Sequence, residues 1–289
     1  MTNFDHLMSG KVCLVTGATA GIGQVTARVL AQQGATVIVV GRNREKSERT
    51  VAQIAQQTGN PHVEYLLADL SSLNAVRKLA AEFKRRQQQL HALVNNAGAI
   101  FLSRHVSADG LEMTFALNHL SYFLLTALLL DTLKASAPAR IVNVSSRVHR
   151  TAHLNFDDLQ NQHGYSGQNV YAQSKLANIL FTYELARRLD GTGITANALH
   201  PGVVATDFAK NNGVLGRIIR LALNPFSISV EEGAQTNVYL ASAPEVEGVT
   251  GKYFVDCKAV PSSPASYDVD AARQLWQVSE QLCGLPSVG

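Results

Sequence analysis

Cysteine is scarce in this chain, and neither positive nor negative charge dominates it. The three cysteines, Cys13, Cys257 and Cys283, lie far apart and belong to no C-x-x-C pair. This pattern predicts neither a disulfide framework nor a bound metal, and it favours a reducing compartment such as the cytoplasm. The 25 basic and 22 acidic residues give a net charge of +3, with the basic residues scattered along the chain. We therefore expect no nucleic acid among its partners.

Long hydrophobic runs are lacking as well. The segment MTNFDHLMSG at the beginning contains no apolar run, so we expect neither a signal peptide nor a transmembrane anchor there. The most apolar internal stretch, residues 122–130, is far shorter than the ~20 residues that a membrane-spanning helix requires. It predicts a helix buried in the core of the protein.

What the chain does contain is an alternation of short apolar segments with helical patterns. The apolar segments are rich in valine and isoleucine, as is typical of parallel strands that helices cover on both faces. Seven segments are predicted as strands: residues 12–16, 36–40, 63–68, 92–95, 140–144, 194–199 and 253–255. The alternation predicts an α/β fold, a doubly wound parallel sheet of about seven strands with helices on both faces. No linker interrupts the series, so we expect one domain over residues 1–289.

Two long connections break this alternation, and both follow predicted strands. Residues 147–169 are polar and rich in turn-forming residues, whereas residues 203–227 contain an apolar patch at 214–223. Open α/β sheets bind ligands at the carboxyl ends of their strands, so both connections are candidates for the substrate pocket. The apolar patch could form a lid over that pocket, touch a membrane surface, or pack over the core.

A cluster of glycines follows the first predicted strand directly and opens a helical pattern. Its spacing is G-x-x-x-G-x-G, from Gly17 to Gly23. A pyrophosphate must approach backbone N–H groups and the start of a helix closely, and side chains at the turn would obstruct this approach. The cluster therefore predicts a dinucleotide site, to which we assign six residues: Gly17, Thr19, Ala20, Gly21, Ile22 and Gly23.

This glycine spacing resembles that of the short-chain dehydrogenase/reductase family, and further motifs extend the resemblance over about residues 10–258. Asn118 lies where the family has a structural and relay asparagine, and Ser146, Tyr171 and Lys175 match its catalytic set. The resemblance implies a Rossmann-type fold with a cofactor half at about 10–140 and a catalytic and substrate half at about 141–289. It also implies further cofactor contacts from Asp69, Leu70, Asn96, Ala97, Gly98, Tyr171, Lys175, Val203 and Thr206.

The end of the second predicted strand indicates which nicotinamide cofactor is used. Enzymes that select NAD usually carry an acidic residue there, which hydrogen-bonds the 2′-hydroxyl of the ribose. This chain has Gly41 at that position, followed by Arg42 and Arg44. The guanidinium group of Arg42 can bind a 2′-phosphate through several donors. We therefore predict NADP(H) as the cofactor, with Arg42 as a ligand; the alternative is that both arginines only face solvent.

Tyr171 and Lys175 are the residues that the sequence offers for proton transfer. They are four apart in a helical pattern, so they share one helix face. A tyrosine with a normal pKa of ~10 exchanges protons poorly near neutral pH, and a neighbouring ammonium group is expected to lower this pKa. Ser146 follows the fifth predicted strand and is expected to hold the substrate oxygen, with Ser145 as the alternative. Three histidines are expected to be structural: His119, His149 and His200.

Within the family, the second half of the chain resembles the retinol dehydrogenase branch. The stretches that carry this resemblance include residues 118–120, 232–236 and 251–258. The branch implies a small lipophilic aldehyde or ketone as substrate and NADPH-driven reduction to the alcohol, a carbonyl reductase activity. Members of that branch commonly carry an N-terminal membrane anchor, which we do not find, so any membrane contact is expected to be peripheral. The family also implies a homodimer or homotetramer, formed through the helices after strands four and five.

Two other functions fit parts of this pattern. An NADPH-binding regulator without turnover would keep the fold, but such proteins usually lose the Tyr/Lys pair that this chain retains. A light-dependent pyrrole reductase would share the Tyr-x-x-x-Lys motif and the Asn-His-Leu stretch, but its cysteine-bearing active-site segments are not evident here. The first would bind NADPH without consuming it, and the second would show a pigment absorbance after purification.

Overall fold

An eight-stranded sheet forms the centre of the protein in the computed structural model, which describes residues 6–204 and 228–286. Its strand order is β3-β2-β1-β4-β5-β6-β7-β8, and all neighbouring strands run parallel except β7 and β8. The strands are β1 (Val12–Thr16), β2 (Thr36–Gly41), β3 (Val63–Leu67), β4 (Ala92–Asn95), β5 (Ala139–Val144), β6 (Ile194–His200), β7 (Tyr253–Val255) and β8 (Lys258–Val260). The strand order reverses between β1 and β4, and the carboxyl ends of these strands border the crevice where such sheets bind ligands.

All seven predicted strands are present, and β8 is an eighth that the prediction missed. It pairs with β7 through a two-residue turn at Asp256 and Cys257, whose φ angles are 49° and 60°. A tight hairpin of this kind needs two residues in the left-handed region, and Asn-Gly or Asp-Gly is its usual sequence signal. Because Asp-Cys lacks the glycine, the hairpin could not be predicted from its turn residues.

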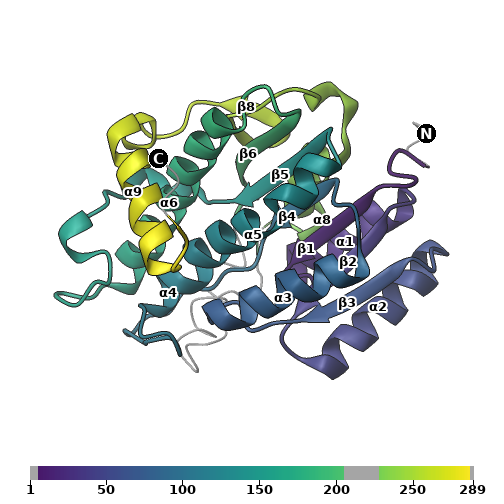
Figure 1. Cartoon of the computed structure of the whole chain (residues 1–289), viewed down its shortest axis with the longest axis horizontal. Coiled ribbons are helices and arrows are strands. Elements are labelled where there is room, and N and C mark those ends of the chain that lie inside the picture. The colour runs from purple at the N-terminus through teal and green to yellow at the C-terminus, as the bar shows by residue number, and fades with distance from the viewer. Residues whose placement is uncertain (1–5, 205–227, 287–289) are drawn as a thin grey trace.

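Helices cover both faces of the sheet (Figure 1). One face packs against α1 (Gly21–Gln32), α2 (Arg44–Thr58) and α8 (Val230–Ser242). The other face packs against α3 (Leu73–Arg86), α5 (Ser121–Ala135) and α6 (Gly167–Arg188), and α9 (Val269–Leu282) lies outside α6. Since the sheet lies between two apolar layers, central strands such as β1 and β4 are buried at every residue. The predicted single-domain, doubly wound α/β fold is confirmed.

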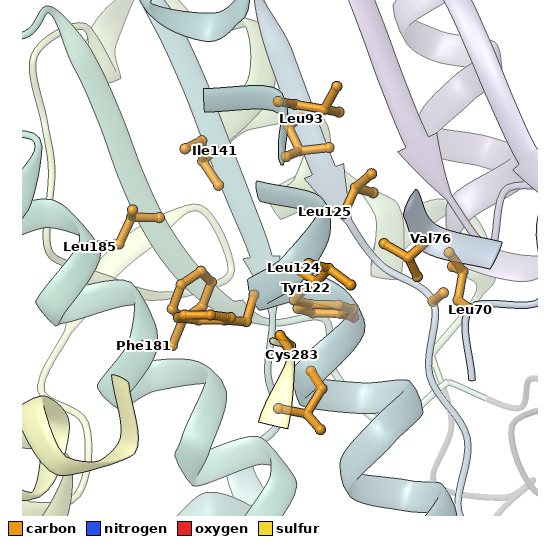
Figure 2. Packing of buried hydrophobic residues seen from close by; sticks show 14 of the residues in the cluster. Leu70, Val76, Leu93, Tyr122, Leu124, Leu125, Ile141, Phe181, Leu185 and Cys283 are labelled. Atoms are coloured by element: carbon orange, nitrogen blue, oxygen red, sulfur yellow. The ribbon is translucent and has the colours of Figure 1, made fainter. Parts of the chain in front are cut away.

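The stretch predicted as a buried helix is part of a much longer one. The short α4 (Met113–Phe115), a π-helical turn at Ala116–Leu120 and α5 form one continuous helix, Met113–Ala135. By length and apolar composition this helix could cross a membrane, so the inference that the run is too short was wrong. In the fold, however, 72% of its most apolar window is buried, and Tyr122 and Leu125 lie among core side chains (Figure 2). Its burial, rather than its length, identifies it as a core helix.

The C-terminal helix α9 packs against α5 and α6, the two helices expected to mediate oligomerisation. The ring of Trp276 contacts Phe123 of α5 and Phe181 of α6, with ring centroids 5.0 and 5.9 Å apart. The guanidinium carbon of Arg188 lies 4.2 Å from the centroid of the same ring. The outer surface of α5 and α6 is therefore partly covered from within the chain.

Candidate active site

The turn between β1 and α1 consists of glycines because backbone atoms fill the space that side chains would need. Gly17 has a φ of +65°, and a Cβ atom on it would lie 2.9 Å from Cα of Ala97. A Cβ atom on Gly23 would lie 2.6 Å from the carbonyl oxygen of Gly17. The turn and the first turn of α1 are thus in backbone contact, which leaves the N–H groups unobstructed by side chains.

The start of α1 lacks the side-chain cap that other helices of this protein have. Asn43 and Ser72 accept hydrogen bonds from backbone N–H groups at the starts of α2 and α3, whereas Ala20 at the start of α1 has no side-chain acceptor. The first N–H groups of α1 and the positive end of its dipole can therefore receive an anion. This geometry fits a dinucleotide pyrophosphate at the glycine turn.

Thr16, which the sequence interpretation overlooked, connects this turn to the end of β4. Its hydroxyl oxygen accepts hydrogen bonds from the backbone N–H groups of Asn96 and Ala97, at 2.8 and 3.0 Å, and donates to the carbonyl of Val94 at 3.3 Å. The side-chain amide of Asn96 donates to the carbonyl oxygen of Thr16 at 2.9 Å. A polar residue at the buried end of an apolar strand was the available signal. These bonds bring two of the predicted cofactor residues against the glycine turn.

At the end of β2 a larger residue at Gly41 would meet neighbouring side chains, and an exposed arginine, Arg42, follows it. A Cβ atom on Gly41 would lie 2.5 Å from Cγ2 of Thr19 and 2.7 Å from Oγ of Ser47. Arg42 is exposed and makes no hydrogen bond or ion pair with any residue that the structure describes. Arg44, by contrast, is already bound to side chains of α2 and β3. Of the two arginines, Arg42 is the one free to bind a phosphate.

Asp69 and Leu70 follow β3 at the same edge of the sheet. Leu70 is buried, whereas Asp69 is exposed. One carboxylate oxygen of Asp69 accepts hydrogen bonds from the N–H and the hydroxyl of Ser71, at 3.0 and 2.7 Å. These bonds fix the carboxylate and leave its second oxygen accessible.

Asn118 is fully buried in the π-helical turn and bridges two segments. Its side-chain oxygen accepts a hydrogen bond from the backbone N–H of Ala99 at 2.9 Å. Its amide nitrogen donates to the carbonyl of Ala99 and to the hydroxyl of Ser174 on α6, both at 3.0 Å. The bonds hold the loop after β4 against α6, which accounts for a structural role, and the relay role stays a prediction.

Tyr171 and Lys175 lie one turn apart on α6, beside the end of β5. Nζ of Lys175 lies 5.5 Å from the centroid of the Tyr171 ring and donates to the carbonyl oxygen of Val144 at 3.1 Å. Burial lowers the pKa of Lys175 to about 7 and raises the pKa of Tyr171 to about 12. The expected lowering of the tyrosine pKa is therefore wrong for the protein alone, because desolvation by burial raises this pKa.

The structure distinguishes the two adjacent serines after β5. Ser145 is buried, and its hydroxyl donates to the carbonyl oxygen of Lys175 at 2.7 Å. Ser146 is half-buried, and its hydroxyl oxygen accepts a long hydrogen bond of 3.5 Å from the N–H of Val148. Residues 147–169 form two short 3₁₀ turns and return the chain to α6. The hydroxyl of Ser146 can therefore reorient toward a substrate, whereas that of Ser145 is held.

The three histidines near this constellation are buried and neutral. His119 contacts the hydroxyl of Ser279 on α9 at 2.9 Å, and burial lowers its pKa to about 4. His149 accepts a hydrogen bond from the N–H of Ser263 at 3.0 Å, and burial lowers its pKa as well. Burial also lowers the pKa of His200 to about 4. The hydrogen bonds of His119 and His149 agree with structural roles, whereas Nδ1 of His200 is buried without a partner among the described residues.

The loop after β6 is described only in part. A Cβ atom on Gly202, whose φ is +87°, would lie 2.4 Å from Cδ1 of Ile228. The carbonyl of Val203 accepts a hydrogen bond from the N–H of Ile228 at 2.8 Å, and the Val203 side chain is exposed. Thr206 and the apolar patch at 214–223 lie outside the described residues, so one predicted wall of the substrate pocket is not placed.

Two cavities lie away from this constellation. One of about 440 Å³ is lined by residues of α6, α9 and the 147–169 connection. The other, of about 550 Å³, lies at the amino-terminal ends of β5 and β6, opposite the glycine turn. Neither is lined by Tyr171 or Lys175, so neither is the pocket that the chemistry requires.

Comparisons with known proteins show the family to which the chain is similar. A family model described as short chain dehydrogenase matches residues 11–213. Retinol dehydrogenase 14 of Homo sapiens is 44% identical over 295 residues, which cover 96% of this chain and 88% of that relative. Both matches include the glycine turn and the Tyr171–Lys175 pair.

Solved structures share the fold. An uncharacterized protein from Mycobacterium paratuberculosis has a TM-score of 0.77 and 32% identity, with 96% of this chain and 94% of that chain covered. The NADP active-site complex of RhlG from Pseudomonas aeruginosa has a TM-score of 0.69 and 27% identity, with 86% and 96% covered. The architecture described above is therefore one that binds NADP in another protein.

Proposed function

Because this chain belongs to the short chain dehydrogenase family, we propose that it is an oxidoreductase that uses NADP(H) to interconvert an apolar aldehyde or ketone with its alcohol. The oxidoreductase class follows from the family model and from the relative named as a retinol dehydrogenase. Bound nicotinamide would supply or accept the hydride. The choice of NADP(H) and of an apolar carbonyl compound rests on particular residues of this chain.

The arrangement of Tyr171 and Lys175 carries this proposal. Reduction of a carbonyl group leaves negative charge on its oxygen, which a proton donor must neutralise. Since burial raises the pKa of Tyr171 to about 12, its hydroxyl keeps its proton at neutral pH and can donate it. The ammonium group of Lys175 beside the ring stabilises the phenolate that remains. Ser146 donates a hydrogen bond to the substrate oxygen, and Asn118 holds α6 against the loop after β4.

The end of β2 supports NADP(H) rather than NAD(H). An acidic residue in place of Gly41 would push against Thr19 and Ser47, and Gly41 itself offers no ligand to a 2′-hydroxyl. Arg42 is exposed, positively charged and without a partner among the described residues. A 2′-phosphate would give this guanidinium a charge-assisted hydrogen bond.

The cofactor preference is tested by comparing NADPH with NADH in Arg42→Ala, with Arg44→Ala as the matched control. Loss of a hydrogen bond to a charged group costs about 1.5–3 kcal/mol, so we expect KM for NADPH to increase roughly tenfold or more in Arg42→Ala. KM for NADH should not change, and Arg44→Ala should have a smaller effect because that arginine is bound to neighbouring side chains. Tighter use of NADH by the unmodified protein would contradict the assignment.

The apolar substrate class is supported by the relative's name, retinol dehydrogenase, and not by a described pocket. The test is NADPH consumption with aldehydes and ketones graded by size and apolarity, retinal included. We expect kcat/KM to increase with apolar chain length. A preference for small polar carbonyl compounds would contradict the substrate class while leaving the oxidoreductase assignment intact. NADPH binding without consumption across the whole set would instead favour the regulator alternative.

Location and assembly complete the proposal. We propose a cytoplasmic location, and subcellular fractionation tests this. A homodimer or homotetramer formed through α5 and α6 would have to use the surface that α9 leaves uncovered. Light scattering of the purified protein measures the state directly, and a monomer at micromolar concentration would contradict that assembly.

A further inference from the structure

Tyr122 of α5 is a buried tyrosine that the catalytic scheme above does not use. It lies one helical turn after Asn118 and is 1% exposed, among the core side chains shown in Figure 2. Its hydroxyl has no hydrogen-bond partner among the described residues. A buried hydroxyl without a partner costs free energy, and phenylalanine would avoid that cost. The hydroxyl therefore does not stabilise the fold, and the ring is the part of Tyr122 that contacts a charged group.

The ring of Tyr122 lies beneath the ammonium group of Lys175. Nζ of Lys175 is 5.9 Å from the centroid of the Tyr122 ring and 5.5 Å from that of Tyr171. The face of an aromatic ring carries negative potential and attracts a cation within about 6 Å. Two phenol rings on different helices therefore face the same ammonium group.

The remaining groups around Nζ offer little compensation for its burial. From β5 the carbonyl oxygen of Val144 accepts one hydrogen bond at 3.1 Å. In the loop after β4, a Cβ atom on Gly98 would lie 3.4 Å from Nζ and 3.2 Å from the amide oxygen of Asn118. Among the described residues no carboxylate pairs with Lys175, and burial alone accounts for its pKa of about 7. The titratable groups that face Nζ are thus the two phenols of Tyr122 and Tyr171.

We propose that Tyr122 is a positioning residue that keeps Lys175 charged and in place through the face of its ring. This inference rests on the proposed function, in which the Lys175 ammonium stabilises the Tyr171 phenolate. It assigns the ring, and not the hydroxyl, as the part of Tyr122 that acts. Loss of the ring should leave a Lys175 that loses its proton at lower pH.

The experiment compares Tyr122→Leu, which removes the ring, with Tyr122→Phe, which keeps the ring and removes only the hydroxyl. The titration of Lys175 is followed by NMR of lysine labelled with ¹³C at Cε, with Lys175→Met used to assign the signal. A cation–π contact of about 1 kcal/mol corresponds to roughly 0.7 pH unit. We therefore expect the Lys175 titration midpoint to fall by about half to one unit in Tyr122→Leu and to stay within about 0.2 unit in Tyr122→Phe.

Turnover supplies the second measurement. The alkaline limb of the pH profile of kcat/KM should move to lower pH in Tyr122→Leu by the same amount as the NMR midpoint. A merely structural role would lower turnover at every pH and reduce thermal stability, without moving either midpoint. If Tyr122→Leu does not fold, Tyr122→Met fills a similar volume without a ring and replaces it.

The outcomes separate the inference from the proposed function. An unmoved Lys175 midpoint in an active, folded Tyr122→Leu would overturn the ring contact and leave the reductase assignment intact. A midpoint that moves equally in Tyr122→Phe would assign the effect to the hydroxyl and also overturn the inference. A protein that consumes no NADPH with any carbonyl compound would refute the function, whereas the NMR titration would still measure the contact.

Discussion

Between β1 and α1 the backbone itself forms the proposed cofactor surface, whereas around Lys175 the surface is made by side chains from several elements. In the cofactor turn, Gly17 and Gly23 bring backbone atoms together within a few residues of sequence. In the catalytic region, Tyr171 and Lys175 on α6 are surrounded by groups from β5 and α5. NADPH binding at the glycine turn should therefore weaken when a single Cβ atom is added there. Turnover in the catalytic region should respond to substitutions in segments that are distant in the sequence.

The largest effect is expected for Tyr171→Phe, which should change turnover in the catalytic region and not cofactor binding at the glycine turn. This change removes the proton donor without altering the glycine turn, so NADPH binding should persist. General acid catalysis contributes roughly 10²–10⁴-fold, and kcat should fall by that factor. Fluorescence titration with NADPH and steady-state turnover measure the two quantities. A variant that keeps more than a tenth of wild-type turnover would refute the role of Tyr171.

Substitutions of the two adjacent serines test which of them acts in catalysis. We expect Ser146→Ala to reduce kcat roughly 10²-fold, as loss of one hydrogen-bond donor to a developing oxyanion typically does. Ser145→Ala should reduce kcat far less and lower the free energy of unfolding by about 1 kcal/mol, since it loses the bond to the Lys175 carbonyl. The reverse ranking in turnover would assign the catalytic role to Ser145.

Lys175→Met tests what burial of the ammonium group costs. Because the pKa of Lys175 is about 7 in the folded chain and 10.5 normally, the unfolded state binds more protons between these pH values. Wild-type stability should therefore increase as pH rises from about 7 toward 10.5, and the full cost is present below 7. Lys175→Met should be more stable by roughly 5 kcal/mol at pH 6, the cost that this pKa shift implies, and should lose turnover. Denaturant unfolding at pH 6 and pH 10 would contradict this if the difference between variant and wild type does not shrink at pH 10.

Gly23→Ala tests the cofactor turn, with Gly59→Ala as its control. The added Cβ at Gly23 meets the Gly17 carbonyl at 2.6 Å, whereas at Gly59 nothing lies within 4 Å. We expect the first change to weaken NADPH binding by about tenfold, equivalent to about 1.4 kcal/mol. The second should cost stability alone, about 1–2 kcal/mol, because its φ is +69°. Equal NADPH affinity in both variants would show that the turn is not the binding surface.

The smallest expected effect tests how far the catalytic region extends. Ser279 of α9 contacts His119, which is adjacent to Asn118 in the π-helical turn. Ser279→Ala should lower the free energy of unfolding by about 1 kcal/mol, the net value of one hydrogen bond. Calorimetry measures this, with kcat measured alongside. A fall in kcat beyond fivefold in the folded variant would place α9 among the elements that support catalysis.

Much of the fold could be predicted because its signals are local. Seven apolar segments gave seven strands with nearly the observed bounds, and the glycine spacing located the turn before α1. The hairpin of β7 and β8 was missed because its turn at Asp256 and Cys257 carries no glycine. The apolar run at 122–130 is only the central part of a helix that extends over Met113–Ala135.

In the candidate site as well, features that depend on local spacing could be predicted, and contacts between distant segments could not. The sequence placed Tyr171 and Lys175 on one helix face, but it could not distinguish Ser145 from Ser146, because only the fold shows which hydroxyl is bound. It gave no signal for Tyr122, whose ring meets Lys175 only after α5 and α6 pack together.

The sequence by itself determined the alternation of strands and helices, the glycine turn and the spacing of the tyrosine–lysine pair, since each depends on residues close along the chain. Tertiary structure alone decided the direction of the pKa changes. Desolvation of Tyr171 and Lys175 depends on how deeply packing buries them, and it causes both pKa changes.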